Sequence, residues 1–491
     1  MKLYVHNSEM KQKFLSSLFL IVLLNVLIKP FYILGIDAEV QNRVGEVAYG
    51  NYYALLNFSF LLNILLDLGI TNYNARNIAQ HPHLIQKNFG RIMGVRFSLF
   101  FLYFGFSSIL AVSFGYNSNE FWMLGVLFFN QFLVAVIQFS RSNFAGLHLF
   151  KSDAFISVLD RSLLIVFVGV LLWGNVTHQA FQIEWFIYAQ TAAYFIAAIT
   201  SISLLKKHVY SIKLSLERLF SIALIKKSFP FALLIFLMMM YNRMDAVMLE
   251  RLLPNGDEQA GIYAQGYRYL DAVNMFALLF AGILLPIFAR MLKQRLDTTD
   301  LVRVAVGLLL TVSVCIASIG FFYQNELIGL RYTDASNLSK MTFGMLILSF
   351  VPVSLTYIYG TLLTANGSLK ALNYMALGGL IANFILNLIL IQSHQALGAA
   401  MATLITQTLT AVVQIVLAYR MITLQFSIKR AFLLCLSAGI IILGTWLIKT
   451  ELDLNQLFLE VLLVFVIAVV SVFALRLIQI KDLIALFKAK S

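Results

Sequence analysis

The chain has 491 residues, of which 60% are hydrophobic and 12% charged, and its formal net charge at pH 7 is +13. Soluble domains contain roughly 45–50% apolar and about 25% charged residues, and no soluble core of this size could hide so much apolar surface. This composition excludes a soluble globular protein, a disordered chain and a disulfide scaffold. The sequence therefore predicts a polytopic membrane protein.

Long apolar runs predict the membrane-spanning helices, each of which needs about 20 mostly apolar residues. The first run begins at Phe14 and continues past Pro30 without a cleavage site, so we expect an uncleaved span and not a signal peptide. Continuous runs, and not the alternating segments of a barrel, indicate an all-α protein. Fourteen spans are expected, at 14–36, 51–69, 92–114, 121–140, 155–174, 184–205, 229–252, 262–288, 301–323, 340–363, 372–392, 398–418, 432–449 and 458–476.

The lysines and arginines predict the orientation, since cytoplasmic segments carry most of them. With a cytoplasmic N-terminus, 28 of the 36 basic residues fall in inner segments and five in outer ones. Both termini are then cytoplasmic, and the excess positive charge is a topology signal. It does not indicate nucleic-acid binding.

Four segments follow from this count. The inner segment 206–228 is predicted to be an amphipathic surface helix, because Leu216 and Phe220 share an apolar side while Glu217 and Arg218 are charged. It separates six spans from eight. The expected segments are an N-lobe (1–205), a cytoplasmic linker (206–228), a C-lobe (229–430), and spans 13 and 14 with a cytoplasmic tail (431–491).

Matching motifs indicate a duplication. Gly50-x-Tyr52 opens span 2 and Gly261-x-Tyr263 opens span 8, and a basic residue follows the inner end of each span. We therefore expect two six-helix repeats plus two C-terminal helices. Six is an even number, so the repeats are parallel and related by an axis along the membrane normal.

The stretch Ala48-Tyr49-Gly50-Asn51-Tyr52-Tyr53, followed by Leu66-Asp67-Leu68-Gly69-Ile70 and Ala75-Arg76, resembles the span 1–2 region of bacterial polysaccharide (O-antigen) flippases. These belong to the multidrug/oligosaccharidyl-lipid/polysaccharide exporter superfamily. The resemblance implies translocation of undecaprenyl-pyrophosphate-linked oligosaccharide across the inner membrane, for O-antigen or capsule-type polysaccharide. It also implies that spans 1, 2, 7 and 8 line a cavity.

Three cations within spans are the candidate substrate ligands: Lys29, Arg243 and Arg268. A charge inside a membrane is costly unless it faces a cavity or a partner, and all three are expected at similar depth in the outer half. The resemblance would bring them together to bind pyrophosphate, which arginine can engage with two hydrogen bonds. The alternative is structural: Arg243 and Arg268 only neutralise nearby Asp245 and Asp271, and Lys29 extends towards the membrane surface.

Other polar residues in the spans are candidates for ion coupling or gating. Asn25 precedes Lys29 by one turn, and Asn274 continues the face of Arg268 and Asp271. Asp67 is expected to cap or gate the inner end of span 2, and Asp160-Arg161 to form an interfacial pair. Pro30 is expected to bend span 1. The complete set is Asp245, Asp271, Asp67, Asn25, Asn274 and Pro30.

Signals of enzymatic chemistry are missing from the sequence. There is no Gly-rich ATP-binding loop, no metal-ligand spacing and no large outer loop, so we expect a transporter without cofactors, coupled to H⁺ or Na⁺ if to any ion. The expected partners are lipid-linked oligosaccharide, membrane lipids and polysaccharide polymerase or glycosyltransferases. Two alternatives stay open: a cation-coupled drug antiporter of the same superfamily, and a non-transporting scaffold of a polysaccharide assembly complex.

Overall fold

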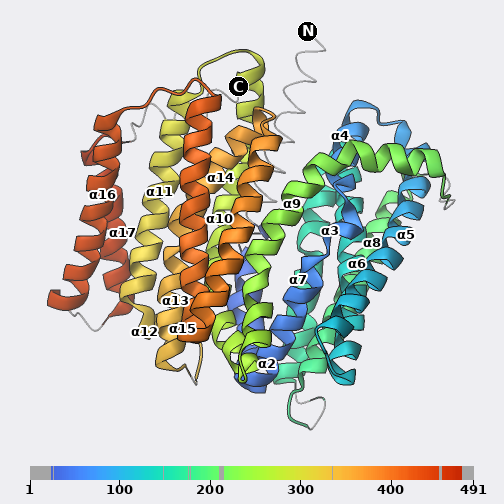
Figure 1. Ribbon diagram of the computed structural model, residues 1–491, viewed down its shortest axis with the longest axis horizontal. Helices are drawn as coiled ribbons and strands as arrows, with labels where there is room; N and C mark the ends of the chain where they lie inside the picture. Colours follow the sequence, from blue (N-terminus) through green and yellow to red (C-terminus); the bar gives the residue numbers. More distant parts are fainter. Residues whose placement is uncertain are drawn as a thin grey trace. The chain divides into compact units, whose positions relative to one another are not determined.

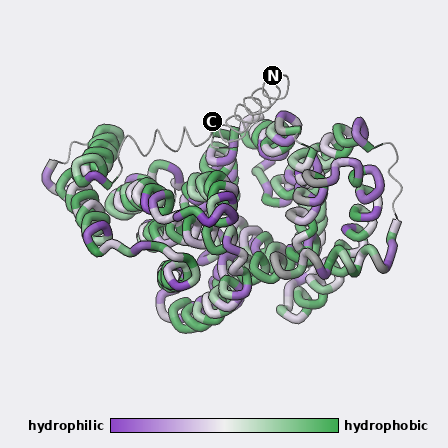
Figure 2. The backbone as a smooth tube through the Cα atoms, turned by 90° about the horizontal axis from the view of Figure 1, so that it is seen from above, coloured by the Kyte–Doolittle hydropathy of each residue, from purple (hydrophilic) through white to green (hydrophobic). Residues whose placement is uncertain are grey.

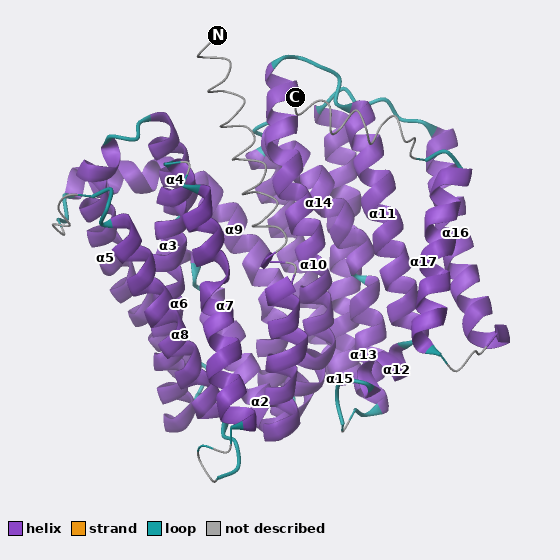
Figure 3. Ribbon diagram, turned by 180° about the vertical axis from the view of Figure 1, so that it is seen from behind, coloured by secondary structure: helices purple, strands orange, loops and turns teal. Residues whose placement is uncertain are grey.

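The computed structural model describes residues 24–25, 27–147, 149–174, 176, 179–209, 215–333, 335–452 and 456–477. Within these residues the chain forms helices and loops and contains no strand (Figure 3). Contacts divide it into two compact units, Met1–Gly261 and Ile262–Ser491. The predicted all-α fold class is confirmed.

The described helices include eleven that are long and apolar enough to cross a membrane, and hydrophobic residues are spread over much of the chain in Figure 2. The longest, α15 (Leu369–Met421), is interrupted at Gln395 (φ 54°, ψ −131°) and so contains predicted spans 11 and 12. Predicted span 1 begins outside the described residues. The total of fourteen spans therefore stays a prediction.

Helix α6 is the centre of the first unit, because α2, α3, α4, α5, α7 and α8 all pack against it. Predicted spans 1 and 2 are joined by helical residues with a single break at Gly45 (φ 82°, ψ 169°). The elements of this unit, some of them labelled in Figure 1, are η1 (a π-helix, Phe31–Asp37), α2 (Ala38–Leu61), α3 (Ile64–Asp67), α4 (Ile70–Gln80), α5 (Leu84–Ser113), α6 (Ser118–Gly146), α7 (Phe150–Trp173), α8 (Ile183–Leu205) and α9 (Arg218–Leu252).

Helix α9 corrects the predicted linker. No separate surface helix spans 206–228 in the described residues: α8 ends at Leu205, and a new helix begins only at Arg218 and continues into span 7. Its first part lies across the ends of other helices, and the rest runs alongside α2 (Figure 1). The start of α9 is held on α5 by Arg91, whose guanidinium lies 2.7 Å from Glu217 and 5.6 Å from the centre of the Phe220 ring.

Helix α11 is the centre of the second unit. Helices α13 and α14 pack on it, α15 covers both, and α16 and α17 pack on another part of α11 through apolar residues that include Val314, Ile441 and Val464. The elements are α10 (Gly256–Lys293, which begins in the first unit), α11 (Thr299–Phe322), α12 (Gln324–Gly329), α13 (Asn337–Leu348), α14 (Phe350–Ala365), α15, α16 (Ile428–Leu447), η2 (Ile448–Leu452) and α17 (Leu457–Ala474). The tail beyond residue 477 lies outside the described residues.

Corresponding residues make corresponding contacts in the two units. Gln190 on α8 donates a hydrogen bond to the Tyr52 hydroxyl (2.6 Å), and the Tyr263 hydroxyl lies 3.2 Å from the Thr403 hydroxyl on α15. In both cases the tyrosine of the Gly-x-Tyr motif is held by the last span of its predicted repeat. The motif glycines have another role, because a Cβ atom on Gly50 would overlap the carbonyl oxygen of Asp257. Gly50 thus permits close contact between backbones.

Candidate functional site

Lys29 lies in a cluster of charges inside the first unit. Arg141 of α6, Arg161 of α7 and the two carboxylates Asp153 and Asp160 all act electrostatically on its half-buried ammonium group. Each arginine has its own carboxylate: Arg141 lies 2.7 Å from Asp153, and Arg161 lies 3.8 Å from Asp160. Among these five side chains three are cations and two are anions, so the group has one excess positive charge.

The guanidinium of Arg161 is held in a fixed position by aromatic rings. It lies 4.8 Å from the centre of the Tyr32 ring and 5.6 Å from that of Tyr194, and it donates a hydrogen bond of 2.9 Å to the Tyr194 hydroxyl. The expected pairing of Asp160 with Arg161 is present. Helix α7 begins at Phe150, so Arg161 lies about 16 Å along it at a rise of 1.5 Å per residue, and its interfacial position stays a prediction. Nothing in the local sequence distinguishes it from an interfacial arginine.

Tyrosines extend this polar region towards the start of α2. Tyr49 donates hydrogen bonds of 3.1 and 3.2 Å to the two carboxylate oxygens of Asp37, and Tyr52 and Tyr32 are buried. The sequence analysis did not select Asp37, Tyr32 or Tyr49. Aromatic residues in a span are ordinarily packing residues, so only their position beside charges distinguishes them.

Asn25 and Pro30 act on the helix that carries Lys29. Asn25 is buried and donates a hydrogen bond of 3.0 Å to the Ser157 hydroxyl, which attaches this helix to α7. Pro30 directly precedes the π-helix η1. A π-helical segment is a recognised cause of a helix bend and is frequent at functional sites, and the gating role of Pro30 stays a prediction.

Arg243 and Asp245 lie on α9, also in the first unit. The Arg243 guanidinium lies 5.2 Å from the centre of the Phe60 ring, and Asp245 is buried, with 1% of its surface exposed. Residues two positions apart on a helix do not face each other, so helix geometry disfavours the predicted pairing of Arg243 with Asp245.

Arg268 lies in the second unit and is buried. It donates a hydrogen bond of 2.8 Å to the hydroxyl of Tyr332, in the loop between α12 and α13. Asp271 and Asn274, both half-buried, follow at spacings that keep them on nearly the same face of α10. The expectation that Arg268 meets Lys29 and Arg243 concerns two separate units and stays a prediction.

Asp67 lies at a break in predicted span 2 and is bound to Arg96 of α5. The guanidinium of Arg96 is 1% exposed, lies 2.5 Å from the Asp67 carboxylate, and also donates to the Thr71 hydroxyl (2.8 Å) and the Ala135 carbonyl (3.1 Å). Asp67 in turn accepts hydrogen bonds from the backbone N–H and the hydroxyl of Thr71. This arrangement caps the first turn of α4, so Asp67 has the contacts of a structural cap.

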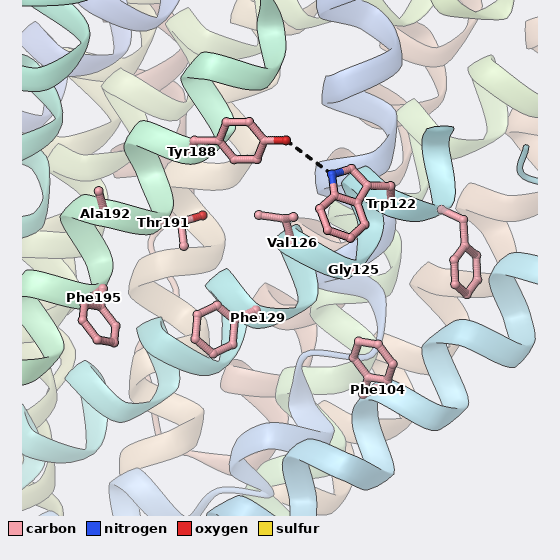
Figure 4. Close-up of a pocket in the computed structure, with 10 residues that line it drawn as sticks. Phe104, Trp122, Gly125, Val126, Phe129, Tyr188, Thr191, Ala192 and Phe195 are labelled. Atoms are coloured by element: carbon pink, nitrogen blue, oxygen red, sulfur yellow. Dashed lines mark hydrogen bonds between the residues drawn. The ribbon is translucent and has the colours of Figure 1, made fainter. Parts of the chain in front are cut away.

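An apolar pocket of about 740 Å³ opens between α5, α6 and α8. Figure 4 shows Phe104, Phe129 and Phe195 along it, with the Trp122 indole donating to the Tyr188 hydroxyl at 3.3 Å. Its lining contains no charged residue. The pocket is therefore unsuited to an anionic headgroup, and the charged cluster around Lys29 is the better candidate site.

Comparisons with known proteins agree with a transporter fold. A family model described as "Polysaccharide biosynthesis protein" matches residues 14–292. Among solved structures, lipid II flippase MurJ in an inward closed conformation aligns with a TM-score of 0.66 and 13% identity, over 95% of this chain and 99% of that chain. A transporter of the MOP superfamily from Pyrococcus furiosus aligns with a TM-score of 0.60 and 14% identity, over 84% and 96%.

An inward-facing multidrug resistance transporter of the MATE family, in the same superfamily, aligns with a TM-score of 0.59 and 13% identity, over 82% of this chain and 98% of that chain. Comparison with curated protein sequences finds no match. At these identities the solved structures show that the fold is shared, and they show nothing about the substrate.

Proposed function

The chain belongs to the polysaccharide biosynthesis protein family, and we propose that it is a flippase for undecaprenyl-pyrophosphate-linked oligosaccharide in the bacterial inner membrane. In this proposal the sugar-pyrophosphate headgroup enters from the cytoplasm, is bound in the interior and is released on the outer side by alternating access. The hydrocarbon tail stays in the bilayer. The product would serve surface polysaccharide synthesis of the O-antigen or capsule type, together with a polymerase and glycosyltransferases.

The observation that carries the proposal is the cationic excess around Lys29. The ammonium group is half-buried and forms no ion pair within 4 Å among the described residues. Leaving a cation partly desolvated without an anion costs free energy, which a bound phosphate would recover. Arg161, already oriented by Tyr32 and Tyr194, supplies planar donors beside it. Arg243 and Arg268 are proposed as further contacts to the headgroup.

A second candidate is a cation-coupled antiporter of the same superfamily. The observation that favours it is a pair of carboxylates inside the first unit: Asp245 is 1% exposed, and Asp37 accepts two hydrogen bonds from Tyr49. Either could bind H⁺ or Na⁺. A scaffold without transport is disfavoured, because it gains nothing from charges that are costly to place inside a membrane.

A transport assay distinguishes the two candidates. In liposomes that contain the purified protein, we expect a fluorescent undecaprenyl-pyrophosphate oligosaccharide to become accessible to a reagent in the opposite compartment. Liposomes containing the Lys29→Gln variant serve as the control. Transport of an organic cation without transport of the lipid-linked sugar would establish the antiporter and overturn our proposal.

The proposed orientation places Ser215, just before α9, in the cytoplasm and Asn337, at the start of α13, outside. In a variant without Cys315 and Cys435, we expect a membrane-impermeant thiol reagent added to intact cells to label Asn337→Cys and to spare Ser215→Cys. Permeabilised cells, in which both should react, provide the control. Labelling of Ser215→Cys in intact cells would reverse the orientation.

For Arg268 we expect the charge to matter for the substrate and not only for Asp271. Arg268→Ala should abolish export, and Arg268→Lys should retain part of it because the charge is kept while the planar guanidinium is lost. Export of surface polysaccharide and membrane protein level are measured together. If the double change Arg268→Ala/Asp271→Ala restores export, Arg268 only neutralises the aspartate and does not bind substrate.

A further inference from the structure

The turn between α9 and α10 packs against the middle of α2 and the start of α6 through a polar network. Asn51 of α2 donates hydrogen bonds of 3.2 Å both to Glu120 of α6 and to Asp257 of α10. The Tyr116 hydroxyl, just before α6, donates to Glu250 of α9 at 3.2 Å. We call this network the outer latch; its members are Asn51, Tyr116, Glu120, Glu250, Arg251 and Asp257.

Arg251 is the central cation of the outer latch. Its guanidinium lies 2.7 Å from Glu250 and 3.8 Å from Glu120, stacks 3.6 Å from the centre of the Tyr116 ring, and donates to the Phe114 carbonyl at 3.1 Å. Burial, followed by the charge of Glu250, raises the pKa of Tyr116, so its hydroxyl keeps the proton that it donates. One arginine thus holds together side chains from both sides of the contact.

The outer latch is incompletely satisfied. It contains three carboxylates and one cation, and the buried Nε atom of Arg251 has no hydrogen-bond partner among the described residues. A partly satisfied polar network contributes less stability than a complete one. Breaking this contact therefore costs less free energy than breaking a fully hydrogen-bonded network would.

Next to the outer latch, α2 and α10 meet through glycine backbone and not through interlocking side chains. Gly50 lies against the Asp257 carbonyl, and Gly261 lies against the Glu46 carbonyl, with no room for a Cβ atom at either glycine. Side chains that interdigitate resist separation, because each must leave a close-packed hole. Two glycine surfaces have no such interlocking, so α2 and the start of α10 can part once the polar network opens.

We infer that the outer latch closes the outer side of the protein and must open in every transport cycle. The inference rests on the proposed function only in assuming such a cycle and the proposed orientation. By sequence, α9 and α10 belong to the second predicted repeat, whereas Asn51, Tyr116 and Glu120 belong to the first. Opening the outer latch would therefore separate helices of the first predicted repeat from helices of the second at the outer end of the protein.

Crosslinking tests whether the outer latch must open. In the variant without Cys315 and Cys435, Asn51→Cys/Asp257→Cys is treated with a short bifunctional thiol reagent, and export is compared before and after treatment of the same protein. We expect export to fall at least tenfold and to recover when reductant cleaves the link. Unchanged export by the linked protein would overturn the inference.

A second measurement does not depend on the substrate. Arg251→Gln should lower the yield of the 51–257 crosslink severalfold, and Glu250→Gln should change it in the same direction. Arg43→Gln is the matched control, because it removes one cation from a surface pair with Glu39 (3.2 Å) on the same side. Equal yields in Arg251→Gln and Arg43→Gln would overturn the inference. If Arg251→Gln lowers the crosslink yield but the protein transports no lipid-linked sugar, the outer latch is supported and the proposed substrate is wrong.

Discussion

Replacement of Lys29 by glutamine should abolish most of the export while leaving the protein in the membrane at its normal level. The ammonium group belongs to a cluster with one excess positive charge, and a hydrogen bond to a charged group contributes about 2 kcal/mol. That corresponds to roughly a 30-fold loss of headgroup affinity. Export of surface polysaccharide and binding of pyrophosphate-containing headgroup are the measurements.

Two controls separate charge from structure. Lys29→Arg keeps the charge and should retain partial activity. Lys370→Gln removes an equivalent charge from an exposed position at the start of α15 and should leave export unchanged. If Lys29→Gln exports normally, or if Lys370→Gln is equally impaired, the cluster around Lys29 is not the headgroup site.

Replacement of Asp67 by alanine should strongly destabilise the first unit. The guanidinium of Arg96, 1% exposed, would lose its only carboxylate partner within the described part of the chain. Removing one member of a buried ion pair costs about 3–5 kcal/mol. We expect the lower end of that range, because the Asp67 side chain keeps 25% of its surface exposed. The apparent unfolding temperature in detergent measures the effect.

The double change Asp67→Ala/Arg96→Met should recover much of that loss, since it removes the buried charge as well as its partner. Glu39→Ala, which breaks an exposed pair with Arg43, is the matched control and should cost less than about 1 kcal/mol. An Asp67→Ala protein that unfolds at the wild-type temperature would show that the carboxylate does not stabilise the break in span 2.

The break itself shows why local sequence was insufficient for span 2. Apolar residues continue through Leu66 and Leu68, so hydropathy indicates one uninterrupted helix over 51–69. In the structure this segment is interrupted at Leu62–Asn63, between α2 and α3, and it ends at Leu68 (φ 45°) and Gly69 (φ 77°), which both adopt left-handed backbone conformations. A leucine rarely takes that conformation alone, and here the surrounding contacts of Arg96 with Asp67, Thr71 and Ala135 stabilise it. Arg96 and Ala135 are distant in sequence from Leu68, and no local pattern connects them with it.

The sequence by itself determined that the chain lies in a membrane, its fold class and the positions of most helices. The reason is that runs of about 20 apolar residues have one stable arrangement in a bilayer. It also located Lys29, Arg243 and Arg268 within predicted spans, since each is conspicuous in an apolar run. Only the tertiary structure decided the partners of those charges. Arg161 lies between Tyr32 and Tyr194, Asp67 is bound to Arg96, and Lys29 lies beside the ion pairs of Arg141 and Arg161. Such pairings join helices far apart along the chain, and they depend on helix rotation and depth, which hydropathy does not specify.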